Sequence, residues 1–117
     1  MRWSAAILSS LVLVGCTERG VEVSESDAEF QKSLQLRLIK AAAGEVIDIP
    51  AGKWTLTRAL SLNKSDVTIR GAGPDKTVLS FKGQVQGAEG LIINAAERVI
   101  VENLAIEDTK GDGLKAN

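Results

Sequence analysis

The sequence predicts an all-β solenoid preceded by a single helix, and three observations lead to this prediction. Apolar runs of three or four residues recur from residue 46 onwards and are short even for strands. Clusters of Gly, Pro and Asp separate these runs, as in tight turns. The pattern charged, apolar, variable, apolar, charged at 66–70 returns 32 residues later at 98–102, an offset typical of stacked repeats. Such short strands suit a solenoid, in which each strand pairs with its equivalents in neighbouring coils.

The composition excludes several classes of function. The 117 residues suffice for one domain. The 14 Lys and Arg residues balance 15 Asp and Glu residues, so there is no basic excess and no nucleic-acid partner is expected. The chain has no His and no Tyr, which excludes a Ser-His-Asp or Cys-His pair, a His-ligated zinc or haem, and a Tyr nucleophile within it. Aromatic residues make up only 3%, so the core must consist mainly of Leu, Ile, Val and Ala.

The N-terminus has the organisation of an export signal. Arg2 supplies a positive charge, and the apolar stretch 5–14 is too short to span a bilayer as a helix. The stretch ends in Leu-Val-Gly-Cys at 13–16, which resembles the lipobox of bacterial lipoproteins. The alternative is an ordinary secretory signal in which Cys16 is incidental.

The lipobox resemblance implies that residues 1–15 are removed as a signal peptide and that Cys16 carries acyl chains such as palmitate. The protein would then be exported and held at the membrane by this anchor. Several acyl chains on one cysteine would make the anchor stable, because a single acyl chain gives only reversible membrane binding. Thr17 stands after the cysteine where Asp would favour the inner membrane, so the bacterial outer membrane is the expected location. Cys16 is the only cysteine, and no disulfide framework is possible.

A tether and a helix follow the predicted anchor. Residues 16–25 are polar and acidic without an apolar period, as in a tether. Ser26 and Glu29 match a capping box, and the segment 26–44 is predicted to hold one amphipathic helix over 27–43. Its apolar stripe comprises Phe30, Leu34, Leu38 and Ala41 or Ala42, and its opposite face comprises mainly Gln31, Lys32, Gln35, Arg37 and Lys40. The basic face is too sparse for a membrane-surface helix, so we expect the helix to cover one end of the core.

Residues 45–117 change from helical to strand periodicity. The predicted strands are 46–49, 54–56, 60–62, 67–69, 78–81, 91–93, 99–101 and 104–106, with a last apolar residue at Leu114. The stretches 44–52, 67–77, 99–106 and 107–115 resemble those of right-handed parallel β-helix repeat lipoproteins of bacteria. The wider group includes pectate lyases, pectin methylesterases and mannuronan epimerases.

This resemblance implies a right-handed parallel β-helix of about three coils with an N-terminal capping helix. Family members are much longer, so the chain is expected to be truncated, the N-terminal portion of a longer protein. A solenoid that ends without a cap exposes strand edges, and self-association through this open end is therefore expected. The alternative is a small, complete β-helix whose open end is covered by a partner or a second copy.

Three residues are predicted to shape turns between strands. The stretch 71–77, with Gly71 and Gly73, lacks the third glycine of a dinucleotide loop and the Gly-Lys pair of a phosphate loop. We interpret it as a turn between coils. In β-helices similar to this one, a residue placed like Asn103 makes the bend between adjacent strands in the left-handed conformation, which Asn tolerates.

The densest acidic group is Glu107, Asp108 and Asp112, with Lys110 among them. One hypothesis is a Ca²⁺ or uronate site, because hard oxygen ligands bind Ca²⁺ and a Lys can act as a base on a sugar acid. The other hypothesis is a solvated turn flanked by surface charges. Trp54 has two interpretations also, either a platform on which a sugar stacks or a residue packed under the helix.

These observations lead to two hypotheses about the function. The first is a lipid-anchored, exported β-helix protein that binds or modifies polysaccharide. The second is a non-catalytic scaffold that acts in structure or protein interaction. Fold analogy alone supports the carbohydrate hypothesis, and no catalytic residue is assigned.

Overall fold

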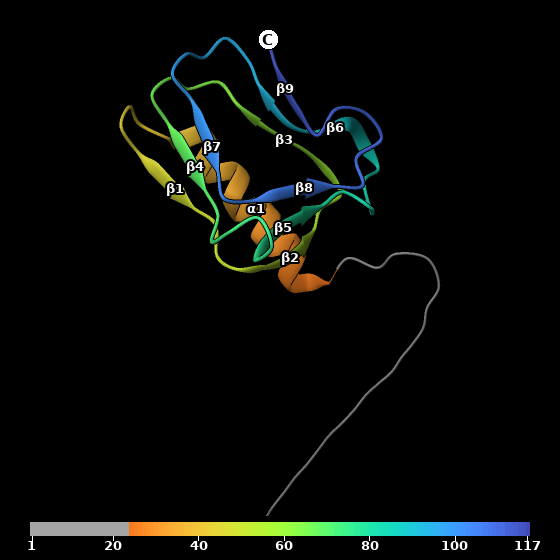
Figure 1. The fold of residues 1–117 in the computed structure, drawn as a ribbon. Coiled ribbons are helices and arrows are strands. Elements are labelled where there is room, and N and C mark those ends of the chain that lie inside the picture. Colours follow the sequence, from red (N-terminus) through yellow and green to blue (C-terminus); the bar gives the residue numbers. More distant parts are fainter. Residues whose placement is uncertain (1–23) are drawn as a thin grey trace, which may run out of the picture.

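The computed structural model describes residues 24–117, which form one helix and nine short strands (Figure 1). The mostly-β prediction is confirmed. The bounds are α1 Glu25–Lys40, β1 Val46–Asp48, β2 Gly52–Thr55, β3 Arg58–Leu62, β4 Thr68–Arg70, β5 Thr77–Ser80, β6 Gln86–Ile93, β7 Ile100–Glu102, β8 Ala105–Glu107 and β9 Leu114–Ala116. The predicted strands lie within a few residues of these bounds, except that β6 begins five residues earlier than predicted.

The strands form three parallel sheets of three strands each, in the orders β1-β4-β7, β2-β5-β8 and β3-β6-β9. The chain therefore makes three passes, and every pass contributes one strand to each sheet. The first pass holds β1, β2 and β3, the second β4, β5 and β6, and the third β7, β8 and β9. Figure 1 shows the three sheets arranged around a common interior. The 32-residue repeat of the sequence corresponds to the register between β4 and β7, because Thr68 pairs with Ile100 and Arg70 with Glu102.

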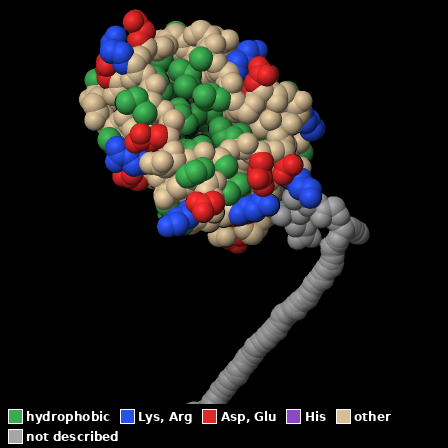
Figure 2. Space-filling model, in the orientation of Figure 1, with side chains coloured by type: hydrophobic (Ala, Val, Ile, Leu, Met, Phe, Trp, Pro, Cys, Tyr) green, Lys and Arg blue, Asp and Glu red, His purple; other side chains and the backbone are tan. Residues whose placement is uncertain are grey.

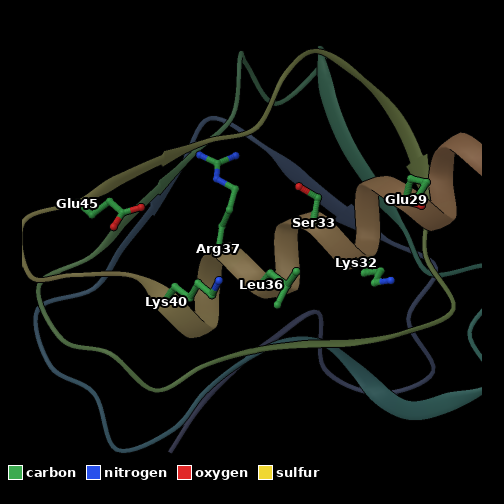
Figure 3. Close-up of a pocket in the computed structure, with 7 residues that line it drawn as sticks. All are labelled: Glu29, Lys32, Ser33, Leu36, Arg37, Lys40 and Glu45. Atoms are coloured by element: carbon green, nitrogen blue, oxygen red, sulfur yellow. The ribbon is translucent and has the colours of Figure 1, made fainter.

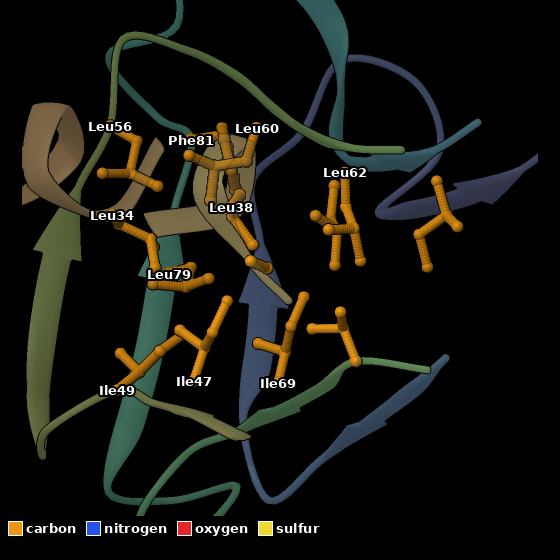
Figure 4. Close-up of a cluster of buried hydrophobic side chains, with 14 residues drawn as sticks. Leu34, Leu38, Ile47, Ile49, Leu56, Leu60, Leu62, Ile69, Leu79 and Phe81 are labelled. Atoms are coloured by element: carbon orange, nitrogen blue, oxygen red, sulfur yellow. The ribbon is translucent and has the colours of Figure 1, made fainter. Parts of the chain in front are cut away.

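The registers stack apolar residues of successive passes in columns that fill this interior. Ile47, Ile69 and Val101 form one such column, and Leu60 and Leu91 belong to another. Because side chains alternate across a strand, a shift of one residue would turn each column outwards. The buried apolar residues of the cluster are Leu34, Leu38, Ala41, Ile47, Ile49, Leu56, Leu60, Leu62, Val67, Ile69, Leu79, Phe81, Leu91 and Ile93 (Figure 4).

Helix α1 begins two residues earlier than the predicted helix and has a different N-cap. The Ser24 hydroxyl, and not that of Ser26, accepts a hydrogen bond from the Asp27 amide at 3.1 Å. The predicted capping box is therefore wrong, although both serines fit the same pattern of side chains that accept from a helix start. The helix ends at Lys40 rather than residue 43, since Ala41 already has an extended backbone, and the Glu45 carboxylate accepts a hydrogen bond from the Ala42 amide at 3.0 Å.

The apolar stripe of α1 covers the first pass. Leu34 and Leu38 are buried in the core cluster. Phe30 stacks on Trp54 of β2 with ring centroids 4.0 Å apart and an angle of 8° between the rings, and the Trp54 indole donates to the Pro50 carbonyl at 3.3 Å. The structure thus favours the packing interpretation of Trp54.

Polar side chains of α1 also form hydrogen bonds with backbone groups of the first pass. The Asp27 carboxylate accepts from the Thr55 amide at 3.2 Å, and the Gln31 amide oxygen accepts from the Thr57 amide at 2.7 Å. Gln35 both donates to and accepts from the Ser61 backbone at 3.0 Å, and Arg37 donates to the Asp48 carbonyl at 3.0 Å. The expectation that Gln31, Gln35 and Arg37 face away from the fold is therefore wrong. These side chains take the place of a preceding strand.

Left-handed residues recur just before the first strand of each pass. Gly44, Asp66 and Arg98 have φ of 87°, 63° and 56° and occupy equivalent positions before β1, β4 and β7. Asn103, after β7, has φ of 59°, the left-handed conformation that was expected for it. Asp108, after β8, has φ of 61°. Bends between strands thus require such residues even where no glycine is present.

Thr77 ties the turn between β4 and β5 to the first pass. Its fully buried hydroxyl accepts from the Ala72 amide at 2.8 Å and lies within hydrogen-bonding distance of the Ile49 and Pro50 carbonyls. We expect Thr77→Val to lower the free energy of unfolding by about 1–2 kcal/mol, because the Ala72 amide loses its acceptor. Urea denaturation measures this loss, and Thr109→Val, on an exposed turn, is the control. Equal stability of Thr77→Val and the natural chain would contradict this role.

Candidate functional site

The outer surface of the β1-β4-β7 sheet carries two ion pairs between the second and third passes. Arg98 contacts Asp66 through two hydrogen bonds, from Nε to Oδ1 at 2.5 Å and from Nη2 to Oδ2 at 3.0 Å. Arg70 Nε donates to Glu102 Oε2 at 2.8 Å. Both pairs join equivalent positions 32 residues apart, so the charged ends of the repeated pattern bind their counterparts in the next pass. All four side chains are substantially exposed.

These contacts shift the titration of the groups involved. The hydrogen bond from Arg98 lowers the pKa of the Asp66 carboxyl, partial desolvation opposes this shift, and the guanidinium charge adds to it. The hydrogen bond to Asp66 likewise raises the pKa of Arg98. The hydrogen bond to Glu102 and then its charge raise the pKa of Arg70, and Asp48 contributes further. Both pKa shifts favour the charged form of the arginines.

The Asp66 shift predicts a pH dependence. A carboxyl with a lowered pKa stabilises the fold at pH values above its ordinary pKa, and this contribution is lost as the pH falls through the lowered value. We expect Arg98→Gln to raise the pKa of Asp66 back towards the ordinary value near 4. An NMR titration of the Asp66 carboxyl carbon measures the change, with Arg58→Gln on β3 as the control. An unchanged pKa in Arg98→Gln would show that the guanidinium does not hold the carboxylate.

The predicted acidic group begins at the end of β8. Glu107 pairs with Lys53 of β2 at 3.1 Å between Nζ and Oε1, so the contact spans from the first pass to the third over the outside of β5. Lys53 was not singled out in the sequence, since its proximity to Glu107 depends on the register of three strands. A pair this exposed is screened by solvent and contributes little to stability.

The other members of the group lie in the segment that joins β8 to β9. Asp108, Lys110 and Asp112 are exposed there, and the segment is held through its backbone, since Gly111 donates to Ala88 at 2.7 Å and Gly90 donates to Asp112 at 3.0 Å. Residues 24–117 contain no group of three or more His, Cys, Asp or Glu side chains placed to hold a metal ion. The acidic side chains are thus available to solvent and to a ligand.

Two shallow hollows flank α1 on its outer side. The first, of about 430 Å³, is lined by Glu29, Lys32, Ser33, Leu36, Arg37, Lys40 and Glu45 (Figure 3). The second, of about 450 Å³, is lined by Gln31, Lys32, Gln35, Leu36, Thr57 and Arg58. Arg37, Gln31 and Gln35 already bind the first-pass backbone or Thr57 from these positions. The hollows therefore arise beside side chains that cap the stack, and they bring together no paired nucleophile and base.

Gly71 and Gly73 shape the turn after β4, as predicted for a turn between passes. Gly73 accepts from the amides of Lys76 and Thr77 at 3.0 and 2.8 Å. The stretch opens no helix, since β5 begins at Thr77, so it lacks the helix N-terminus on which phosphate-binding loops rely. A Cβ atom at Gly71 would meet the Asn103 carbonyl oxygen, which places both turn residues in direct contact.

The predicted lipidation site, Cys16, and the signal peptide lie outside the described residues. Among residues 24–117, α1 is neither long nor apolar enough to cross a membrane. No family model matches the chain, and no curated protein or solved structure matches it significantly.

Proposed function

We propose that this chain is an exported, lipid-anchored right-handed parallel β-helix protein that binds polysaccharide at the bacterial outer membrane. The observation that supports it best is the stack of three parallel sheets, in which every pass adds one strand to each sheet. Such a stack presents flat outer faces along which an extended polymer can lie. Charged side chains on or beside these faces, among them Lys53 on β2, Glu107 at the end of β8 and Lys110 in the segment that follows, can hydrogen-bond sugar hydroxyls, and the lysines can also bind sugar carboxylates.

The anchor has a direct test. Cells that express the chain are grown with labelled palmitate, and the label is expected on the natural chain and not on Cys16→Ser. The control is Cys16→Ser itself detected with an antibody, which separates loss of the label from loss of the protein. Label on Cys16→Ser, or none on the natural chain, would overturn the proposed lipoprotein.

Polysaccharide binding is tested by affinity electrophoresis in gels that contain an acidic polyuronate or a neutral glucan. We expect the polyuronate to retard the natural chain, and Lys53→Gln with Lys110→Gln to weaken binding roughly tenfold, because charge-assisted hydrogen bonds are lost. Lys64→Gln, at an exposed position in the connection between β3 and β4, is the control. Runs with Ca²⁺ and with a chelator test whether Glu107, Asp108 and Asp112 contribute through Ca²⁺. No retardation by any polymer would overturn the proposal.

The third pass supports a second candidate, a non-catalytic scaffold for protein interaction. Residues 94–117 are all exposed or half-buried, so their side chains are accessible to a protein partner. A chain that associates with protein but is not retarded by polysaccharide would favour this candidate.

A further inference from the structure

The side of α1 that faces away from the core carries exposed apolar side chains between cations. Leu36 and Ile39 are 45% and 54% exposed. Figure 3 shows Lys32, Leu36 and Lys40 in a row along the helix, at the four-residue spacing that places side chains next to one another. Both hollows described above share Lys32 and Leu36. Helix α1 therefore has a second apolar strip, bordered by cations, which the stack does not cover.

Cations outnumber acidic side chains around this strip, although the whole chain has a net charge of −1. The charged residues that line the two hollows are Lys32, Arg37, Lys40, Arg58, Glu29 and Glu45. Within residues 24–117, Lys32, Lys40 and Arg58 form no ion pair. The acidic Glu25 and Glu29 belong to the first turns of the helix, so the cations gather from Lys32 onwards. Their charges are available to an anionic surface.

The other end of the stack has a different charge pattern. Figure 2 shows the molecule from the side of the third pass, where cationic and acidic side chains lie next to one another around the face. In the second and third passes, Arg98 pairs with Asp66 and Arg70 pairs with Glu102, so these cations are already matched. A surface of mixed, paired charges has little attraction for an anionic surface. The side of α1 is the one with an excess of unpaired cations.

The proposed anchor holds α1 close to a membrane. Residues 17–23 separate Cys16 from Ser24, the N-cap of the helix. Even a fully extended chain advances at most about 3.6 Å per residue, so the start of α1 lies within about 29 Å of the anchored cysteine. A short tether of this kind keeps a local concentration in the millimolar range. Weak attraction by a few cations is then sufficient, although it would not hold an unanchored helix at a membrane.

We propose that the outer side of α1 lies against the anionic phospholipid surface in which Cys16 is anchored. Leu36 and Ile39 enter the headgroup region, and the ammonium and guanidinium groups of Lys32, Lys40 and Arg58 contact lipid phosphates. The inference rests on the lipid anchor of the proposed function and goes beyond polysaccharide binding. Because α1 covers the first pass, this contact directs the stack away from the membrane and leaves its outer faces open to a polymer.

The test measures whether α1 lies in the membrane surface. The full chain is acylated in cells, reconstituted into vesicles of phosphatidylethanolamine and phosphatidylglycerol, and labelled with a nitroxide at Leu36→Cys, the only free thiol once Cys16 is acylated. Collisions with oxygen, which concentrates in lipid, are compared with collisions with a nickel chelate, which stays in water. We expect this nitroxide to favour oxygen. Ile100→Cys on β7, where Ile100 is 52% exposed, is the matched control and should favour the chelate.

Charge variants test the attraction itself. Lys32→Gln with Arg58→Gln, in the Leu36→Cys chain, should lower the ratio of docked to undocked helix about 30-fold, because each cation near an anionic surface contributes about fivefold. Lys76→Gln with Lys82→Gln removes two exposed lysines from turns of the second pass and should leave the ratio unchanged. Vesicles of phosphatidylcholine, which carry no net charge, should weaken docking of the natural charges as well.

The outcomes separate the contact from the anchor. A chain that does not float with the vesicles lacks the anchor and overturns both the inference and the proposed lipoprotein. A chain that floats with the Leu36→Cys nitroxide in water overturns the inference alone. Equal docking of the two charge variants, or equal docking on neutral vesicles, also overturns it. A nitroxide that leaves water only after polyuronate or a second copy is added would assign the hollows to that occupant instead.

Discussion

Phe81→Ala is expected to lower the free energy of unfolding by about 3–5 kcal/mol, the largest effect of any single truncation considered for this fold. Phe81 is the largest fully buried side chain of the described residues. It follows β5 in the second pass, where passes on both sides enclose it. A stack of three passes has little freedom to collapse around the missing ring, since every strand is held in register by its neighbours.

Urea denaturation followed by far-ultraviolet circular dichroism measures this loss. The matched control is Val85→Ala, because Val85 lies in the same connection but is 78% exposed, and it should change stability by less than about 0.5 kcal/mol. A loss below about 1 kcal/mol for Phe81→Ala would contradict the proposed packing. An equal loss for both variants would place the effect in the connection rather than in the core.

Gly71→Val is expected to cost about 3 kcal/mol or more, through lack of space and not through backbone conformation. A Cβ atom at Gly71 would lie 2.8 Å from Leu104 Cβ and 2.9 Å from Thr77 Cβ, and closer still to the Asn103 carbonyl oxygen. The Asn103 oxygen belongs to the backbone, and the Cβ atoms of Leu104 and Thr77 are bonded directly to it, so none of the three can move aside by a change of rotamer. The second and third passes would therefore have to separate.

Gly113→Ala is the control for this substitution. A Cβ atom at Gly113 would meet nothing closer than Ile106 at 3.6 Å, an ordinary contact, and the change should be nearly neutral. Denaturation curves of the two variants are compared with that of the natural chain. A Gly71→Val protein of natural stability would mean that the turn of one pass does not rest on the bend of the next.

The sequence predicted the strands well because their signal is local. Residues 66–70 and 98–102 carry the same pattern, and the structure pairs them directly. Which strands share a sheet could not be read in the same way for the other columns, since their offsets differ. Leu60 pairs with Leu91, whereas Leu91 pairs with Leu114, and no fixed period joins these three positions. Insertions between strands change the offset without changing the stack.

The helix was predicted in part, and its polar side shows what was missed. The apolar stripe through Leu34 and Leu38 was found from its spacing. Asp27, Gln31 and Gln35 have the same four-residue spacing and lie beside that stripe, so a signal was present. Polar residues at helical spacing usually face solvent, and only the position of the first-pass backbone identifies these as caps.

The candidate site was predicted least. Glu107 and its acidic neighbours were found from their density in the sequence, but the contact with Lys53 depends on how β2, β5 and β8 are stacked. Arg98 and Asp66 were found as the ends of a repeat and not as a pair. Side chains from different passes meet only after folding, so charge density along the chain says little about them.

The stacking of each pass on the one before has a consequence for the order in which the protein forms. Strand β4 pairs with β1 and β7 pairs with β4, so no pass requires one that has not yet been made. A chain that emerges N-terminus first delivers α1 and then the passes in the order of their dependence. In pulse-labelled refolding, the amides of β4 should gain protection from hydrogen exchange before those of β7. Helix α1 is then a template for growth in one direction, and each completed pass becomes the template for the next.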